Sequence, residues 1–144
     1  SALPTGPTRP PTRTGRSADF GPSCPPREDK PLALDPRGVT RDYDSGAAAA
    51  SGVIKSTPGR LYNLWGFNNK ASAQYIQVFN TAAVPADTTA PAMPPLYVAA
   101  TSAFFYDFGE LGVDFTTGIC WSNSSTFGTK TIGSSDCWTH AAFR

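Results

Sequence analysis

The sequence predicts an all-β protein, a β-sandwich or jelly-roll-like domain preceded by an extended proline-rich N-terminal arm. From residue 53 onward, short runs of aromatic and β-branched residues alternate with Gly, Pro, Asn and Ser turn signals, as is typical of sandwiches and barrels. No segment shows sustained 3.6-residue periodicity, so no amphipathic helix is predicted. Nine of the 14 prolines lie within the first 36 residues, which sets this region apart from the rest.

Length and charge limit the classes of protein that this chain can represent. A chain of 144 residues is one domain, or one domain with a tail. The formal net charge of +1 gives no support for a specific nucleic-acid partner. No apolar run is long enough to span a membrane, and no basic region followed by an apolar run opens the chain. We therefore expect a protein made in the cytoplasm, with no membrane partner; the alternative is that a signal was cleaved before residue 1.

Residues 1–46 form the predicted arm. Large apolar residues are too few there to offset the entropy of ordering the segment, and its prolines favour extended conformations. The first 16 residues hold Arg9, Arg13 and Arg16 and no acidic residue. Two interpretations stay open: a solvated linker, or an arm that orders against neighbouring subunits and uses these arginines for intermolecular contacts.

Residues 47–52 are predicted to be a hinge, and residues 53–144 the sandwich domain. The hinge is an alanine run that is too short to form a helix alone and is followed by Gly52. The first strand of the domain is predicted at Val53–Thr57. Pro58-Gly59 is a turn signal that ends it.

The stretch Gly59–Asn80 is predicted to be the centre of the sandwich. Leu61–Phe67 and Gln74–Phe79 are rich in aromatic and β-branched residues, and the Asn- and Ser-containing turn between them suits a hairpin. We therefore expect a long hairpin. In its first strand the alternation predicts that Leu61, Trp65 and Phe67 face the core.

The rest of the chain is predicted to add a connection and six strands. Residues 81–95 contain four prolines, which exclude a central strand and a regular helix, so this segment packs across one end of the sandwich or contacts a partner. The further strands are Leu96–Ala100, Ala103–Phe108, Val113–Phe115, Ile119–Ser122, Thr129–Ile132 and Cys137–Phe143. The predicted core is Ile54, Leu61, Trp65, Phe67, Tyr75, Ile76, Val78, Phe79, Leu96, Val98, Phe105, Phe108, Phe115, Ile119, Trp121, Ile132, Trp138 and Phe143.

Catalytic chemistry has little support in the sequence. His140 is the only histidine, and in a strand it lies about 13 Å from the residue four positions away, Asp136, too far for a hydrogen bond. Asp107, Glu110 and Asp114 surround a glycine-rich turn and suit solvent-exposed turn positions better than a carboxylate pair. We expect no catalytic residues, no cofactor and no metal, and hence not an enzyme.

The three cysteines leave three arrangements open. Cys24 lies in the arm, and Cys120 and Cys137 lie in predicted strands. All three can be free thiols, two of them buried as small hydrophobic residues. Alternatively, Cys120 and Cys137 form an internal disulfide, or Cys24 forms an intermolecular contact as the odd cysteine.

The tryptophans have two interpretations. Packing in the core is the usual role of a tryptophan in a small domain. The alternative is a platform on which sugars stack, made by Trp65, Trp121 or Trp138. Exposed tryptophans favour the platform, and buried ones favour packing.

Two regions, Gly59–Pro95 and Asp107–Arg144, resemble a group of small virion structural proteins of tailed bacteriophages. The shared features are the opening Gly-Arg-Leu-Tyr, the stretch Ala73–Asn80, the loop Pro85-Ala86-Asp87 and the Gly118-Ile119 strand. The resemblance implies a β-sandwich or jelly-roll module on a phage head, neck, fibre or tail. It implies no catalytic residues, and it does not include the arm.

We therefore expect a structural virion protein, made in the host cytoplasm and located in the virion. A capsid decoration or cement protein is favoured, with the sandwich outside and the arm between subunits. The expected partners are the major capsid protein or other virion subunits, and a homo-oligomer, with a trimer favoured. A neck, collar or tail structural protein is one alternative. A receptor- or glycan-binding module is the other.

Overall fold

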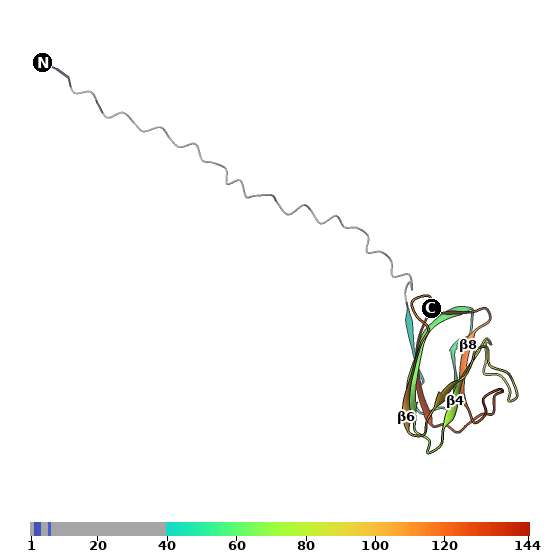
Figure 1. Cartoon of the computed structure of the whole chain (residues 1–144). Helices are drawn as coiled ribbons and strands as arrows, with labels where there is room; N and C mark the ends of the chain where they lie inside the picture. Colours follow the sequence, from blue (N-terminus) through green and yellow to red (C-terminus); the bar gives the residue numbers. More distant parts are fainter. Residues whose placement is uncertain (1, 4–5, 7–39) are drawn as a thin grey trace. The chain divides into compact units, whose positions relative to one another are not determined.

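The computed structural model of the chain describes residues 2–3, 6 and 40–144. The described part is all-β: nine strands form two antiparallel sheets that pack together as a β-sandwich (Figure 1). No helix occurs among these residues. The predicted fold class is confirmed at this level. The predicted extended arm falls largely on residues outside the described ones.

The first sheet has the strand order β1-β9-β3-β6, and β7 also pairs with β3. Its strands are β1 (Arg41–Asp44), β3 (Gly59–Asn68), β6 (Ser102–Asp107), β7 (Val113–Phe115) and β9 (Cys137–Phe143). The ten residues of β3 let one strand take two partners on the same edge. Its Asn63–Asn68 half pairs with β6, and its Gly59–Leu61 half pairs with β7.

The second sheet has the strand order β2-β8-β4-β5. Its strands are β2 (Ser51–Lys55), β4 (Gln74–Phe79), β5 (Leu96–Val98) and β8 (Ile119–Ser124). Every residue of β8 is buried, as expected for a strand covered on both faces. In Figure 1, β4 and β8 lie on the opposite side of the sandwich from β6.

The predicted central hairpin is wrong, because β3 and β4 belong to different sheets. The buried Asn68 turns the chain between them. Its amide nitrogen donates to the carbonyl oxygens of Ser72 (3.1 Å) and Ala99 (2.9 Å), and its amide oxygen accepts from the backbone N–H of Lys70 (3.0 Å). These bonds satisfy the Lys70 N–H and the Ser72 carbonyl within the connection, and the bond to Ala99 links the connection to the segment after β5.

The folded domain begins before the boundary that the sequence suggested. β1 lies within the predicted arm and pairs with β9 over four residues. The predicted hinge is also hydrogen-bonded. The N–H of Ala49 donates to the carbonyl of Cys137 (2.9 Å), and the N–H of Asn123 donates to the carbonyl of Ala50 (2.8 Å). Small residues here let the chain pass closely between the two sheets, so the alanine run joins them.

A β-bulge at Tyr62 reverses the predicted inward face of β3. Leu61 pairs with Phe143 and Asn63 pairs with Ala142, so Tyr62 is the extra residue. Beyond the bulge, Leu64 is buried and Trp65 faces outward. A one-residue shift moves every following side chain to the other face.

The core lies between the two sheets and confirms much of the predicted set. Ile54, Leu61, Ile76, Val78, Phe79, Val98, Phe115, Ile119, Trp121 and Phe143 are buried as predicted. Leu96 and Phe108 pack against this core from partly buried positions, and Tyr75 is also partly buried. Trp65 and Phe67 are partly exposed, and Phe105, Ile132 and Trp138 are exposed. In β6 it is Phe104, not Phe105, that points inward, because Phe104 pairs with Gly66.

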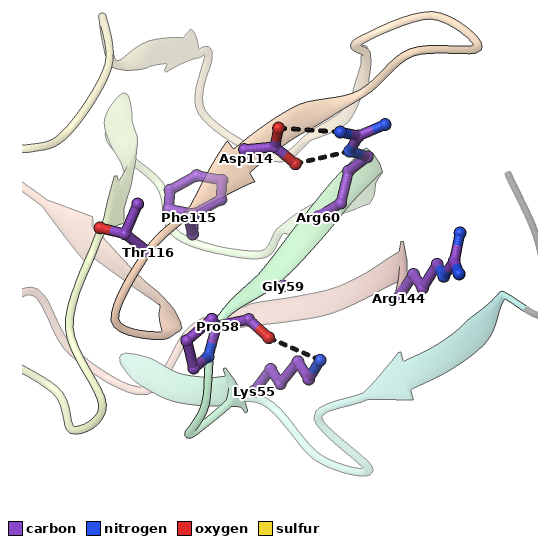
Figure 2. A pocket seen from close by; sticks show the side chains of 8 residues that line it. All are labelled: Lys55, Pro58, Gly59, Arg60, Asp114, Phe115, Thr116 and Arg144. Atoms are coloured by element: carbon purple, nitrogen blue, oxygen red, sulfur yellow. Dashed lines mark hydrogen bonds and ion pairs between the residues drawn. The ribbon is translucent and has the colours of Figure 1, made fainter.

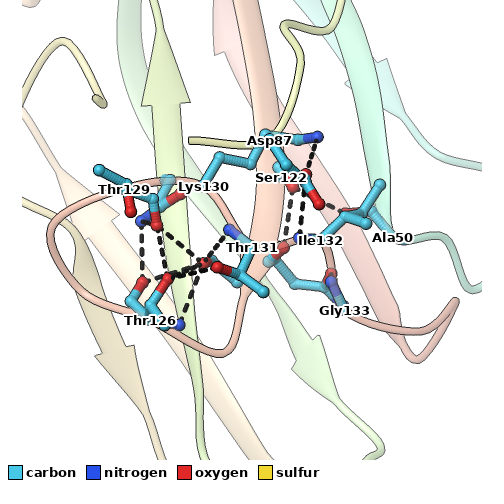
Figure 3. A network of polar contacts seen from close by, with 12 residues as sticks. Ala50, Asp87, Ser122, Thr126, Thr129, Lys130, Thr131, Ile132 and Gly133 are labelled. Carbon is cyan, nitrogen blue, oxygen red and sulfur yellow. Dashed lines mark hydrogen bonds and ion pairs between the residues drawn. The ribbon is translucent and has the colours of Figure 1, made fainter. Parts of the chain in front are cut away.

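The predicted strand Thr129–Ile132 does not form; only an isolated bridge joins Ser124 and Ile132. Side chains occupy the backbone groups that a ladder needs (Figure 3). The N–H of Thr131 donates to the hydroxyl of Ser124 (3.0 Å), and the N–H of Ile132 donates to the Asp87 carboxylate (3.2 Å). Such side-chain bonds compete with strand pairing.

The proline-rich connection of residues 81–95 packs on the Thr129–Ile132 loop of its own domain. The N–H of Thr88 donates to the carbonyl of Lys130, and the N–H of Lys130 donates to the carbonyl of Thr89, both at 2.8 Å. The buried ammonium of Lys130 also pairs with Asp87 at 2.8 Å. The two loops therefore stabilise each other.

Candidate functional site

The solvent-facing side of the first sheet carries a continuous group of aromatic side chains, which we call the aromatic face. Two of its members are among the exposed large hydrophobic residues, Phe105 at 64% and Trp138 at 38%. The other three are partly exposed. The aromatic face consists of Trp65, Phe67, Phe105, Trp138 and His140.

Strand register brings these residues together. Trp65 of β3 lies opposite His140 of β9 on one side and opposite Phe105 of β6 on the other. Phe67, two residues further along β3, lies opposite Trp138. Directly opposed side chains in neighbouring strands lie about 5 Å apart, so the five rings form two adjacent rows across three strands.

The row through Trp65 is ordered by a ring stack. The rings of Trp65 and His140 are stacked, with centroids 5.5 Å apart and planes at 15°. On the far side of the imidazole, Nδ1 of His140 lies 3.6 Å from a carboxylate oxygen of Asp44 in β1. The same Asp44 oxygen accepts the N–H of Gly46 at 2.7 Å. The carboxylate therefore holds a turn at one end of the row and approaches the imidazole.

Carboxylates border the aromatic face on both edges of the sheet. Asp42 and Asp44 alternate with an inward-facing residue of β1, so both carboxylates lie on the outer side. Asp107 lies at the end of β6, opposite Asn63. Asn63 lies opposite Ala142 of β9, and Ala142 lies opposite Asp42 of β1. Asp107 and Asp42 are therefore the two ends of one row across the sheet. A flat aromatic surface with an acidic rim suits an apolar, positively charged partner.

The tryptophans divide between buried and solvent-facing positions. Trp121 is fully buried, and its indole N–H donates to the hydroxyl of Tyr43 at 3.1 Å. Trp121 thus joins the two sheets and is not a surface platform. Trp65 and Trp138 lie on the aromatic face, on neighbouring strands.

Of the arrangements that the sequence left open, Cys120 and Cys137 are free and buried and form no internal disulfide. The thiol of Cys120 donates to the carbonyl of Thr81 (3.1 Å), and Cys137 contacts the Asn68 amide oxygen at 3.9 Å. Burial raises the pKa of both thiols. The other residues predicted for intermolecular contact lie outside the described residues: Cys24, Arg9, Arg13 and Arg16.

The acidic residues around the glycine-rich turn have separate partners. Asp107 accepts the N–H of Gly109 at 2.8 Å. Asp114 pairs with Arg60 through two hydrogen bonds, and that guanidinium lowers the pKa of the carboxyl. Glu110 lies exposed in the turn. These carboxylates therefore serve a turn and an ion pair.

A second surface feature is an open pocket of about 640 Å³ near the start of β3 (Figure 2). Three cationic side chains line it, Lys55, Arg60 and Arg144. Two of them already have partners: Arg60 binds Asp114, and Lys55 donates to the carbonyl of Pro58 at 2.7 Å. The pocket therefore offers less free positive charge than its composition suggests.

The sequence analysis assigned Trp65, Phe67, Phe105 and Trp138 to the core, and the bulge at Tyr62 explains the error for the two β3 residues, Trp65 and Phe67. A bulge inserts one residue without a characteristic sequence, so the alternation before it gave the wrong phase after it. In β9, the alternation of Trp138 and His140 with the small residues Thr139 and Ala141 was a usable signal. Small residues face the core there, and the larger rings face outward.

Comparisons of the chain with protein-family models, curated proteins and solved structures find no match. The described residues include no helix that is long and apolar enough to cross a membrane. Within the same residues, no cluster of three or more His, Cys, Asp or Glu side chains is arranged to hold a metal ion.

Proposed function

We propose that this chain is a structural virion protein, most specifically a capsid decoration or cement protein, which binds a neighbouring virion subunit through its aromatic face. The observation that carries the proposal is the set of five aromatic side chains gathered on the solvent side of one sheet. Contiguous exposed apolar patches on soluble domains mark interaction surfaces. The proposed role is structural and involves no catalysis.

The shape and composition of the aromatic face favour a protein partner. Small-molecule sites are concave, whereas this surface is the face of a sheet. Aromatic side chains are enriched in the buried centres of protein interfaces. Phe105 and Trp138, the most exposed members, supply the contact area, and the Trp65–His140 stack limits the side-chain entropy lost on binding.

The resemblance of Gly59–Pro95 and Asp107–Arg144 to small phage virion proteins supports the assignment to a virion. Within that proposal, the N-terminal residues 1–46 act as the extended arm between subunits. The partners are the major capsid protein or other copies of this chain. A homo-oligomer, with a trimer favoured, suits the threefold positions of a capsid. A neck, collar or tail position uses the same face and is the alternative within the class.

Imaging of particles and a pair of matched variants test the proposal. Phe105→Ser removes an aromatic ring that is 64% exposed on the aromatic face, and Tyr97→Ser removes one that is 60% exposed on the other sheet. Particles assembled with each variant are purified and imaged by cryo-electron microscopy. We expect Phe105→Ser to lose occupancy on the particle and Tyr97→Ser to retain it, with both variants folded by circular dichroism.

Density for the chain on the capsid surface supports decoration, and density at the neck or tail supports the alternative. Particles that contain no copy of the wild-type chain contradict a virion role. Equal occupancy of the two variants contradicts the use of the aromatic face.

A second candidate is the receptor- or glycan-binding module. The specific observation in its favour is that Trp65 and Trp138 both face solvent on neighbouring strands, where sugar rings can stack. Titration of oligosaccharides against intrinsic tryptophan fluorescence tests it. Saturable quenching that Trp138→Ala abolishes and Tyr97→Ala retains favours this module over the structural role.

A further inference from the structure

We propose that the segment Arg9–Arg13 of a neighbouring copy of this chain binds across the aromatic face. The inference rests on the proposed function, and it names the partner of the face. The segment reads Arg-Pro-Pro-Thr-Arg, two cations separated by two prolines and a threonine. The face offers aromatic rings between two acidic edges, so each part of the segment has a counterpart.

The acidic edges set the distance that the segment must span. Asp42 lies on β1 and Asp107 on β6, with β9 and β3 between them. Neighbouring strands lie about 4.8 Å apart, so three steps separate the two carboxylates by about 14 Å across the sheet. The Trp65 row of the aromatic face lies next to the line that joins Asp42 and Asp107. The reason is that Asp44, two residues after Asp42 in β1, lies in the Trp65 row.

The proline-rich segment has the matching length. An extended polyproline-type peptide rises about 3.1 Å per residue, so four residues place Arg9 and Arg13 about 12 Å apart. Long arginine side chains cover the remaining difference. Pro10 and Pro11 then lie over the middle of the sheet, on the side of Trp65 and His140.

The interactions on each side are chemically complementary. Proline rings pack on aromatic surfaces, and a proline-containing peptide loses little backbone entropy when it binds. Guanidinium groups bind carboxylates through charge-assisted hydrogen bonds and stack on aromatic faces. The first 16 residues carry three arginines and no acid. The nearest cation on the outer side of β3, Arg60, is already paired with Asp114 and does not repel them.

Multiple copies strengthen a contact of this size. A five-residue segment alone binds weakly, but subunits held side by side on one particle raise its effective concentration. The contact then links one subunit to the next through many weak, repeated interactions.

Paramagnetic relaxation in mixed samples of the full chain tests the contact. One sample is ¹⁵N-labelled wild type. The other is unlabelled chain with a nitroxide on Ser17→Cys in a Cys24→Ser background, where the buried Cys120 and Cys137 stay unmodified. After mixing, we expect the amide signals of Phe105 and Trp138 to lose intensity and that of Tyr97 to retain it.

Matched substitutions in the spin-labelled chain identify the contact residues. Arg9→Ser with Arg13→Ser should abolish the loss of intensity, and Arg27→Ser with Arg37→Ser should leave it. No loss at Phe105 and Trp138, or equal loss at Tyr97, overturns the proposal. If the amide signals lose intensity only in a sample whose nitroxide and ¹⁵N are in the same molecule, and not in the mixed sample, the proposed contact between copies is overturned. This measurement uses purified protein, so its result is independent of whether the chain is found in particles.

Discussion

The imidazole of His140 lies nearly parallel to the indole of Trp65, with ring centroids 5.5 Å apart and 15° between the planes. The two residues come from β9 and β3, which are far apart in the sequence. The stack holds the only histidine of the chain at the β1 end of the Trp65 row of the aromatic face. Asp136, the acid nearest to His140 in the sequence, accepts a hydrogen bond from the hydroxyl of Ser134.

Loss of this stack should lower stability. His140→Ala removes one ring of a stacked pair, worth about 0.5–1.5 kcal/mol beyond the area that it buries. We expect a reduced free energy of unfolding, measured by urea denaturation followed by tryptophan fluorescence. His140→Phe keeps a ring at this position and should restore most of the difference. An alanine variant as stable as wild type contradicts a stabilising stack.

The bond between Tyr43 and Trp121 should anchor β1 to the domain. Tyr43→Phe leaves the buried indole N–H of Trp121 without its acceptor, which costs about 1–3 kcal/mol. Tyr97→Phe changes an exposed tyrosine and should alter stability by less than about 0.5 kcal/mol. Thermal melting of both variants by circular dichroism provides the comparison, and equal melting temperatures would count against the anchoring role.

Gly66 should tolerate no side chain. A Cβ there would lie 1.9 Å from the carbonyl oxygen of Trp138 and 2.7 Å from the ring of Phe104, whereas a Cβ at Gly128 would have nothing within 4 Å. We expect Gly66→Ala to destabilise the domain by about 1–3 kcal/mol or more, because overpacking forces the backbone and ring to move. Gly128→Ala is the control and should melt like wild type.

The ion pair between Asp87 and Lys130 should make stability depend on acidic pH. The hydrogen bond from Lys130 lowers the pKa of the Asp87 carboxyl below its ordinary value of 3.8. Because the folded-state pKa is the lower one, the stabilisation is present above the unfolded-state pKa and is lost as the pH falls through the folded-state pKa.

We therefore expect Asp87→Asn to be less stable than wild type at neutral pH, with the difference disappearing in strong acid. Urea midpoints measured across this pH range test the expectation. Glu110→Gln, in the exposed turn, is the control. A difference between Asp87→Asn and wild type that is the same at every pH would show that the carboxylate charge is not the cause.

The two buried thiols should be inert in the folded protein. Cys120 and Cys137 have no solvent exposure, and burial raises the pKa of each thiol, which lowers the reactive thiolate fraction. In a Cys24→Ser variant we expect no reaction with a thiol reagent at pH 8, and reaction of two thiols in urea. Rapid labelling of the folded protein would show that these strands open readily.

The sequence by itself determined the all-β class and most of the strand positions. Glycine and proline turn signals, together with β-branched and aromatic runs, are local features, so β4, β7 and β9 were predicted at their observed bounds. Buried residues before the bulge, such as Ile54 and Leu61, were also predicted. The sequence alone also shows that the first 16 residues carry Arg9, Arg13 and Arg16 and no acidic residue.

Only the tertiary structure decided which strands pair and which face each side chain takes. Pairing depends on contacts between residues that are distant in the sequence, such as the one that Asn68 makes with Ala99. The bulge at Tyr62 is defined by the register of β3 with β9, and local alternation cannot reveal it. Trp65, Phe67, Phe105 and Trp138 therefore lie outside the core that the sequence predicted, and with His140 they form the aromatic face.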